Sequence, residues 1–343
     1  MTSYSTLPRT FDRAQTYLYF KEKINQLFTP ENTRNHNNTV RALLLASLNN
    51  GYVESSSETL KLCGQTVRNH IKHQNPQRVL EVNQAVIQEM KNKGALAKPL
   101  ILAVDWHDVM YYGDSTAEGV VGAMPQNGSC YAYRFATASV LLNGQRVTLA
   151  VVPMLDRCAL PHVESLLATV FQLGLSVKLL LFDRGYYSTA LIRYLDERGL
   201  KYIIHIPWHG KRLQAGIDRL HTTTTHKRKQ VEQATFRLVT VRQKDKLLVF
   251  ATNTSFRRRW VRRVFRRRWG IETSYRLIGM FLAKTTSKLY RLRVLYFFLA
   301  VLLYNLWVCR NFRRKLTVSV YVLKHGLRLF LVFSWLTDLE EGG

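Results

Sequence analysis

The chain has 343 residues, 47% hydrophobic and 11% aromatic, and this composition excludes a disordered or low-complexity protein. Its 50 Lys and Arg against 23 Asp and Glu give a formal net charge of +27, which makes nucleic acid the expected partner. We expect no membrane partner, because the longest apolar run, residues 294–308, is shorter than the roughly 20 residues of a spanning helix and contains Asn305.

The chain up to residue 98 predicts a small all-helical domain. Apolar periodicity places helices at residues 39–48, 56–62 and 65–73, with a tight Cys-Gly turn between the last two. This pattern is that of a helix-turn-helix in a DNA-binding domain, and an ordinary three-helix bundle is the alternative. Four side chains at the start of the candidate recognition helix suit base edges and phosphates: Gln65, Thr66, Arg68 and Asn69.

From residue 99 the hydrophobic period changes from that of helices to that of strands, so we place a domain boundary there. The first apolar run ends in charge, which is typical of a strand buried on both faces. An Asn-Gly dipeptide joins the next two strands as a hairpin. The order of elements predicts a mixed α/β sheet whose antiparallel part comes first. The predicted strands are residues 100–108, 130–142, 146–155, 177–182 and 202–206, and the predicted helices are residues 162–173 and 189–198.

Residues 207–253 interrupt this alternation and predict a mostly β insertion. The insertion begins with a basic, Thr-rich stretch that we interpret as a loop, HTTTTHKRKQ, and continues with strands at 236–242 and 247–252. The catalytic domain is expected to extend over residues 99–310, and residues 311–343 are expected to form a helical tail.

The densest positive charge lies in residues 255–284. Eight arginines fall between Arg257 and Arg268 with no acid among them, and apolar residues recur between them at helical spacing. The lone carboxylate that follows, Glu272, has Arg268 four residues before it and Arg276 four after, which predicts all three on one face of a helix. Taken alone, this is a solvated helix face with one internal ion pair.

Two aspartates upstream change that interpretation of Glu272. Asp105 is predicted to end the first strand and Asp183 the fourth, and side chains at the carboxyl ends of adjacent strands meet at one sheet edge. Three carboxylates in an apolar sheet repel one another unless a cation neutralises them, and hard oxygen ligands select Mg²⁺ or Mn²⁺. Asp108 and Asp114 compete with Asp105 for this role, and Asp183 has the alternative role of capping the next helix.

Four stretches carry a resemblance to a known family: VDWHD at Asp105, LLLFDRGYYS at Asp183, FATN at residues 250–253 and RRRWGIETSYRLI at Glu272. Over residues 99–310 the chain resembles insertion-sequence DDE transposases with an RNase H-like catalytic domain, of the group with a β insertion before the glutamate, and most those of archaeal elements.

In that group the glutamate belongs to a Tyr-x2-Arg-x3-Glu-x6-Lys pattern. Arg268 and Glu272 match it, whereas Phe265 stands in place of the tyrosine and Gly279 in place of the lysine. Lys284 and Lys288 are candidates to replace the missing lysine.

The resemblance implies a DNA transposase that cleaves at transposon ends and transfers the 3′-hydroxyl into target DNA. It implies that Asp105, Asp183 and Glu272 are catalytic and hold two Mg²⁺ or Mn²⁺ ions, and that a homodimer forms in the synaptic complex. Further DNA-binding candidates are Arg184, Arg257, Arg258, Arg262, Arg263, Arg266, Arg268, Tyr275, Arg276 and Lys284.

Two alternatives stay open: a metal-dependent DNA endonuclease without strand transfer, and a catalytically silent DNA-binding protein derived from a transposase. Four scattered cysteines without a Cys-x-x-Cys pair indicate a reducing compartment and no structural zinc. We therefore expect a cytoplasmic, nucleoid-associated protein of a prokaryote.

Overall fold

The computed structural model describes residues 13–27, 33–142, 144–156, 158–207, 216–227, 230–243, 246–314 and 318–340. They form two compact units, Leu96–Ser274 and the combination of Met1–Ala95 with Tyr275–Gly343. This division differs from the three consecutive segments that we predicted, because the C-terminal helices pack with the N-terminal ones. The predicted end of the catalytic domain at residue 310 lies inside one continuous helix, Tyr290–Arg314.

The first unit is helical. Its apolar helix α10 packs against α5, and α11 packs against α1 and α2. The helix-turn-helix segment comprises α2, α3 and α4. The sequence explains where α5 begins. The Asn75 side chain caps the helix by accepting a 3.1 Å hydrogen bond from the Gln77 amide, and Pro76 occupies the first turn. Its helices are α1 (Arg13–Asn25), α2 (Thr33–Asn49), α3 (Val53–Thr59), α4 (Gly64–Lys72), α5 (Pro76–Asn92), α10 (Tyr290–Arg314) and α11 (Val320–Glu340).

Helix α10 is the one helix of the described ranges that is long and apolar enough to cross a membrane, and 94% of its most apolar window is buried inside the protein. A helix that is apolar all round needs such burial. Its buried Asn305 is satisfied, since this side chain donates a 2.7 Å hydrogen bond to Asn83 of α5. In this structure α10 is therefore a core helix.

The second unit is built on one mixed sheet with the strand order β2-β3-β1-β5-β6-β9-β8-β7, and β4 also pairs with β3. Strand β3 is antiparallel to β1 and β4, whereas β1, β5 and β6 run parallel. The antiparallel part therefore comes first in the chain, as predicted. The strands are β1 (Leu100–Tyr111), β2 (Val121–Gln126), β3 (Ser129–Leu142), β4 (Gln145–Met154), β5 (Val177–Phe182), β6 (Tyr202–His205), β7 (Asp218–Lys227), β8 (Gln230–Gln243) and β9 (Lys246–Thr252).

Two hairpins of this sheet form at Asn-Gly dipeptides. The predicted hairpin joins β3 to β4 with Leu142 paired to Gln145; Gly144 has a φ of 80°, and Asn143 lies outside the described residues. Strand β2 escaped prediction, although Asn127 and Gly128 join it to β3 with φ angles of 50° and 84°. Two central residues with positive φ are what a two-residue hairpin turn requires, so the same signal was present twice.

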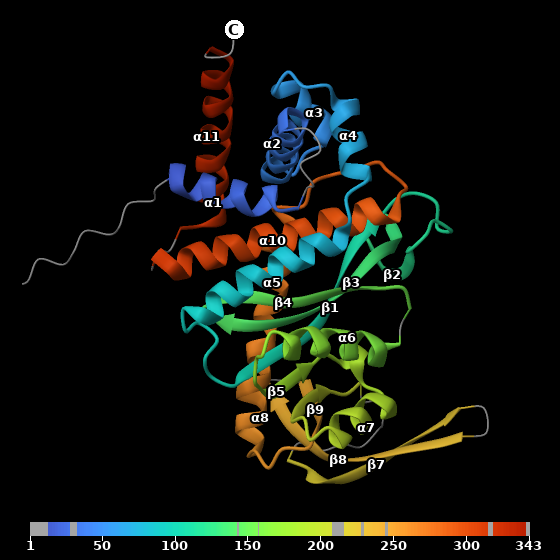
Figure 1. Cartoon of the computed structure of the whole chain (residues 1–343). Helices are drawn as coiled ribbons and strands as arrows, with labels where there is room; N and C mark the ends of the chain where they lie inside the picture. The colour runs from blue at the N-terminus through green and yellow to red at the C-terminus, as the bar shows by residue number, and fades with distance from the viewer. Residues whose placement is uncertain are drawn as a thin grey trace, which may run out of the picture. The chain divides into compact units, whose positions relative to one another are not determined.

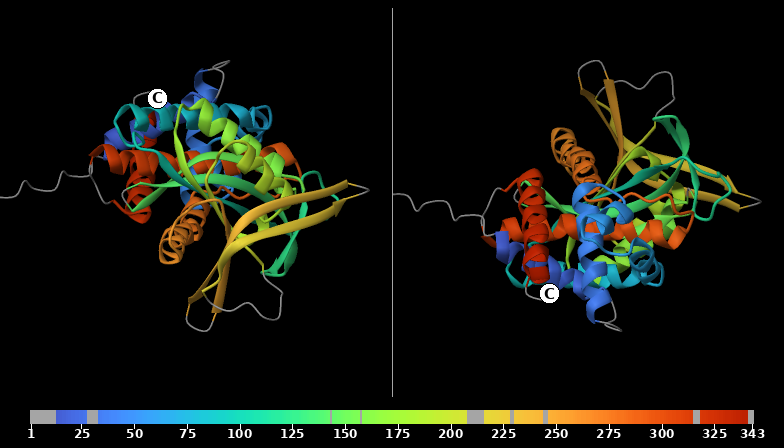
Figure 2. Two further views of the ribbon diagram at one scale, coloured as in Figure 1. Left: turned by 90° about the horizontal axis from the view of Figure 1, so that it is seen from below. Right: turned by 90° about the horizontal axis from the view of Figure 1, so that it is seen from above.

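Residues 221–227 of the Thr-rich stretch, which we interpreted as a loop, belong to the strand β7. It pairs with β8 over its whole length, and β8 pairs with β9, which returns to the central sheet beside β6. Threonine is β-branched and favours extended backbone, so four in succession support a strand. In Figure 1 and Figure 2, β7 and β8 extend as a long two-stranded ribbon away from β9.

Helices cover both faces of the sheet. On one face lie α6 (Ala159–Gln172), which packs on β3 and β4, and α7 (Thr189–Glu197), which packs on β7 and β8. On the other face lies α8 (Arg258–Phe265), whose buried side chains Val261, Val264 and Phe265 join a cluster with Leu179 of β5 and Phe250 of β9. The apolar stripe between the arginines therefore packs as predicted, and the arginines are left outside it.

The Arg-rich segment is not the single helix that we predicted. After α8 the backbone tightens into a 3₁₀ turn, η2 (Arg266–Trp269), and α9 (Gly270–Gly279) begins anew. At the junction the chain passes close to Arg146, since a Cβ on Gly270 would lie 2.6 Å from its guanidinium. The prediction that Arg268, Glu272 and Arg276 share one helix face is therefore wrong, because Arg268 lies in the 3₁₀ turn.

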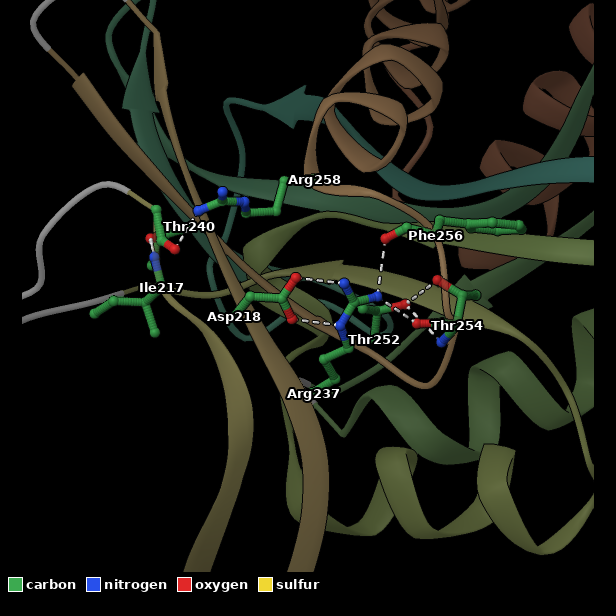
Figure 3. A network of polar contacts seen from close by, with 9 residues as sticks. Ile217, Asp218, Arg237, Thr240, Thr252, Thr254, Phe256 and Arg258 are labelled. Carbon is green, nitrogen blue, oxygen red and sulfur yellow. Dashed lines mark hydrogen bonds and ion pairs between the residues drawn. The ribbon is translucent and has the colours of Figure 1, made fainter.

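A polar network fixes the base of the ribbon to the segment that leads into α8 (Figure 3). Arg237 of β8 makes two 2.5 Å hydrogen bonds to the carboxylate of Asp218 on β7. Its remaining terminal nitrogen donates to the carbonyl oxygens of Thr254 and Phe256, at 2.7 and 2.8 Å. Arg258 donates to the carbonyl oxygen of Gly216, so the first turn of α8 is tied to the same place.

Candidate active site

Two aspartates lie side by side at one edge of the sheet. The parallel pairing of β1 with β5 runs to Val104 opposite Phe182, so Asp105 and Asp183 are the next residue on each strand. We predicted that β1 ends at Asp105, and this is wrong. The strand continues to Tyr111 because β3 still pairs with it on its other side, while β5 stops at Phe182. Because β5 ends at Phe182, Asp105 has no pairing partner on β5 and lies beside Asp183.

A single guanidinium contacts both carboxylates. Nη1 of Arg268 donates a 2.6 Å hydrogen bond to Oδ2 of Asp105, and Nη2 lies 3.5 Å from Oδ1 of Asp183. The Arg268 side chain is 8% exposed, and its guanidinium lies 5.5 Å from the ring centre of Phe265. The residue that we predicted to position DNA phosphates is thus buried against the aspartates.

The two carboxyl groups have opposite pKa shifts. Burial raises the pKa of Asp105 to about 6, even though Arg268 opposes this shift. Burial also acts to raise the pKa of Asp183, but a hydrogen bond from His205 and the charge of Arg268 outweigh it and lower that pKa to about 2. His205 Nδ1 lies 3.7 Å from Asp183 Oδ1. Environments that separate the pKa values of neighbouring carboxyl groups are characteristic of catalytic sites.

Aromatic packing behind the aspartates sets their separation. Trp106 follows Asp105 and lies with its ring centre 4.9 Å from that of Tyr186, which packs in turn on Phe182. A Cβ on Gly185 would lie 1.8 Å from the Trp106 ring, so only glycine leaves room for the indole. Tyr186 is fully buried here.

Glu272 stands in the first turn of α9 and is exposed to solvent. Its charge acts on Asp105 and raises the pKa of that group, after the larger effects of burial, Arg268 and Asp183. The third carboxylate is therefore within electrostatic range. In the part of the chain that the structure describes, however, no group of three or more His, Cys, Asp or Glu side chains is placed to hold a metal ion.

The competing roles of nearby aspartates are resolved by their contacts. Asp108 forms a two-pronged ion pair with Arg134, at 2.6 and 2.7 Å, on the next strand. Asp114 accepts hydrogen bonds from the amide and hydroxyl of Thr116, at 2.9 and 2.7 Å. Asp183 makes no side-chain capping bond, and the helix that follows it is capped by Ser188 instead.

Most of the predicted DNA-binding side chains are accessible, with three exceptions. Arg262 is half-buried, while Arg268 and Tyr275 are buried, at 6% exposure each. At that exposure Tyr275 presents little of its ring to solvent. The candidates that are exposed to solvent are Arg184, Arg257, Arg258, Arg263, Arg266, Arg276 and Lys284.

The candidate recognition helix α4 carries exposed polar side chains at its start. These side chains also bond to one another: Gln65 donates to Asn69 at 2.8 Å, and Arg68 donates to Gln65 at 2.6 Å. Arg68 also lies 3.3 Å from Glu54 of α3. Thr66 is exposed beside them. The arrangement presents a preformed polar surface at one end of the helix.

Sequence reasoning missed the residues that support the aspartates. His205, at the end of β6, was assigned no role, and Trp106 was overlooked beside Asp105. Both leave a signal in the sequence. Trp106 directly follows Asp105, and His205 ends the apolar strand that neighbours the strand before Asp183. Their contacts depend on the pairing of strands that are distant in sequence.

Comparison with known proteins gives a family and a fold. The family model of the transposase DDE domain matches residues 97–306. A piggyBac transposase, solved as a synaptic complex with hairpin DNA, superposes with a TM-score of 0.61 at 11% identity, covering 97% of this chain and 83% of that chain. Endonuclease V from Bacillus subtilis gives a TM-score of 0.26 at 14% identity, covering 70% of this chain and 93% of that one. No curated protein sequence matches the chain.

The likeness to the piggyBac structure shows the fold, a mixed α/β sheet of the RNase H-like type with a helical N-terminal region. The family match shows more, because it extends over more than half of the 343 residues and contains both sheet-edge aspartates and Glu272. The chain therefore belongs to the transposase DDE domain family, and it is a DNA transposase.

Proposed function

We propose that this transposase cuts DNA at the ends of its element and joins the freed 3′-hydroxyl to target DNA, using a divalent metal centre on Asp105, Asp183 and Glu272. The observation that carries the proposal is that two aspartates on neighbouring strands contact one guanidinium, with Arg268 at 2.6 Å from Asp105 and 3.5 Å from Asp183. A third carboxylate lies in electrostatic range on α9.

The donor set fits a divalent cation. Carboxylate oxygens are the ligands that Mg²⁺ and Mn²⁺ prefer, and a positive group already neutralises the pair in this structure. The family implies divalent-metal dependence in general. We propose Mg²⁺ or Mn²⁺ and two ions, with the aspartates as shared ligands and Glu272 completing the second. Bound there, such ions supply Lewis acidity and charge neutralisation for phosphodiester chemistry.

The chain's own residues provide the grip on DNA. The exposed arginines of α8 and η2 lie on the side of the segment that its buried apolar stripe leaves free. Each phosphate contact releases a counterion, so affinity should fall steeply with salt. We assign end recognition to α4 through Gln65, Thr66, Arg68 and Asn69.

We also propose that two copies assemble on the paired transposon ends, because two DNA ends must be brought together before joining. The free thiols of Cys63, Cys130, Cys158 and Cys309 accord with a reducing, nucleoid-associated location.

A labelled-DNA assay tests the proposal. The substrate is a duplex that carries the terminal sequence of the element, incubated with Mg²⁺ or Mn²⁺ and a target plasmid. Wild type should give cut ends and joined product, while Asp183→Asn and Asp105→Asn should lower cleavage by about 10³-fold or more and leave DNA binding intact. Asp114→Asn is the matched control and should retain activity.

The remaining outcomes discriminate the alternatives. Cleavage without joined product identifies an endonuclease without strand transfer. DNA binding with neither reaction identifies a silent DNA-binding protein derived from a transposase. Retained cleavage in Asp183→Asn overturns the assignment of the site.

A further inference from the structure

We propose that Arg268 is a built-in cation that holds the two aspartates together in the metal-free protein, and that a divalent metal ion must displace it to load the site. This inference rests on the proposed metal centre and adds a step before catalysis. Arg268 thereby becomes a positioning residue that opposes metal binding, instead of a DNA contact.

The contacts place Arg268 where the metal would lie. One oxygen of Asp105 accepts a 2.9 Å hydrogen bond from the amide of Trp106. The other accepts a 2.6 Å hydrogen bond from Nη1 of Arg268. The same guanidinium reaches Asp183 at 3.5 Å. An ion shared by the two aspartates would bond to these oxygens at roughly 2.0 to 2.1 Å, and two positive groups cannot share that space without strong repulsion.

The guanidinium is also incompletely held, which makes displacement feasible. Among the described residues its Nε is buried without a hydrogen-bond partner, and the contact with Asp183 is long. The buried Arg134 differs, because Nε and Nη2 both donate short bonds to one carboxylate, at 2.6 and 2.7 Å. A buried charged group with an unsatisfied hydrogen-bond donor recovers less of its desolvation free energy in its site.

The backbone that carries Arg268 is a short break between two α-helices. Residues Arg266–Trp269 form a 3₁₀ turn between α8 and α9, and mid-helix 3₁₀ segments often mark hinges. Arg266 and Arg267 on the same turn point to solvent, so the turn can change without opening the apolar cluster of α8.

The test measures Mn²⁺ binding to the full chain without DNA, by isothermal titration calorimetry. Arg268→Gln should bind Mn²⁺ about tenfold more tightly than wild type, because a competing positive charge is removed. Arg267→Gln removes the same charge one residue away, from an exposed side chain that touches neither aspartate, and should change affinity less than about twofold. Unchanged or weaker binding in Arg268→Gln overturns the inference.

Two further arms keep the test decisive if that variant folds poorly. Arg268→Lys keeps the charge and loses the forked geometry, so its affinity should lie between those of wild type and Arg268→Gln. In wild type, Mn²⁺ should increase hydrogen exchange of the amides at residues 266–269; unchanged exchange on binding overturns the displacement. If neither wild type nor Arg268→Gln binds Mn²⁺, the proposed metal centre itself fails.

Discussion

Two clusters of the sheet unit in which an arginine contacts aspartate are built differently. At the base of the ribbon, Arg237 donates to both oxygens of Asp218 and to two backbone carbonyls (Figure 3). At the sheet edge, Arg268 makes one short bond to Asp105 and one long contact with Asp183, and its Nε has no partner among the described residues.

The difference separates a structural network from a site that awaits a ligand. A fully bonded charge pair offsets its own desolvation and rigidifies the chain around it, as Arg237 does for the segment leading into α8. A charge pair with incomplete hydrogen bonding offsets less of its desolvation penalty, and natural proteins tolerate such pairs mainly at functional positions. The incomplete cluster is the one that contains Asp105 and Asp183, the two aspartates of the proposed metal centre.

The largest effect on stability should come from breaking the complete network. Arg237→Ala removes four hydrogen bonds and leaves the carboxylate of Asp218 and two carbonyl groups without their donor, so it should lower the free energy of unfolding by about 3 kcal/mol. Urea denaturation measures this loss. Arg219→Ala, an exposed neighbour on β7, should change it by less than about 0.5 kcal/mol. A loss below about 1 kcal/mol for Arg237→Ala would contradict the structural role.

The comparison also shows which features sequence can predict. Continuous apolar runs predict the strands that lead to Asp105 and Asp183. Parallel pairing of those two strands then predicts that the two aspartates lie close together, as they do. The buried face of α8 follows likewise from Val261, Val264 and Phe265 at helical spacing.

Other features depend on contacts that no local pattern contains. The inward turn of Arg268 arises because the helix breaks after Phe265, where packing near Arg146 leaves room only for Gly270. The apolar residues keep a helical period of 3.6 across the point where the helix breaks. The sequence pattern therefore predicted Arg268 and Glu272 on one helix face. His205 approaches Asp183 through strand order alone.

Asp105 of the sheet-edge cluster and Asp218 of the ribbon base should respond to pH with opposite sign, while Asp183, whose pKa is lowered, should respond like Asp218. The pKa of Asp105 is about 6, above that of an unfolded aspartate, so its contribution is full below about pH 4 and is lost as pH rises through 6. The pKa of Asp218 is lowered, chiefly by its hydrogen bond from Arg237, so its contribution is present above about pH 4 and is lost as pH falls.

Without metal, in a chelating buffer, Asp105→Asn should therefore be more stable than wild type at pH 7, by about 2 kcal/mol, and should lack the decline of stability between pH 4 and 6. Asp218→Asn should be less stable than wild type at pH 7. Thermal unfolding across this pH range measures both, and the same sign of change for both variants would end the distinction between the clusters.

A smaller effect should follow from the way each cluster is held in place. Hydrogen bonds fix Arg237, whereas packing of Trp106 into the space above Gly185 fixes the aspartates, since a Cβ there would lie 1.8 Å from the indole. Gly185→Ala should lower the free energy of unfolding by about 1 to 3 kcal/mol and weaken Mn²⁺ binding, because the indole must shift and carries Asp105 with it. Gly51→Ala, whose Cβ would have its nearest neighbour at 3.6 Å, is the control. If Gly185→Ala binds Mn²⁺ as wild type does, the separation of the aspartates is set by strand pairing alone, and aromatic packing has no part in it.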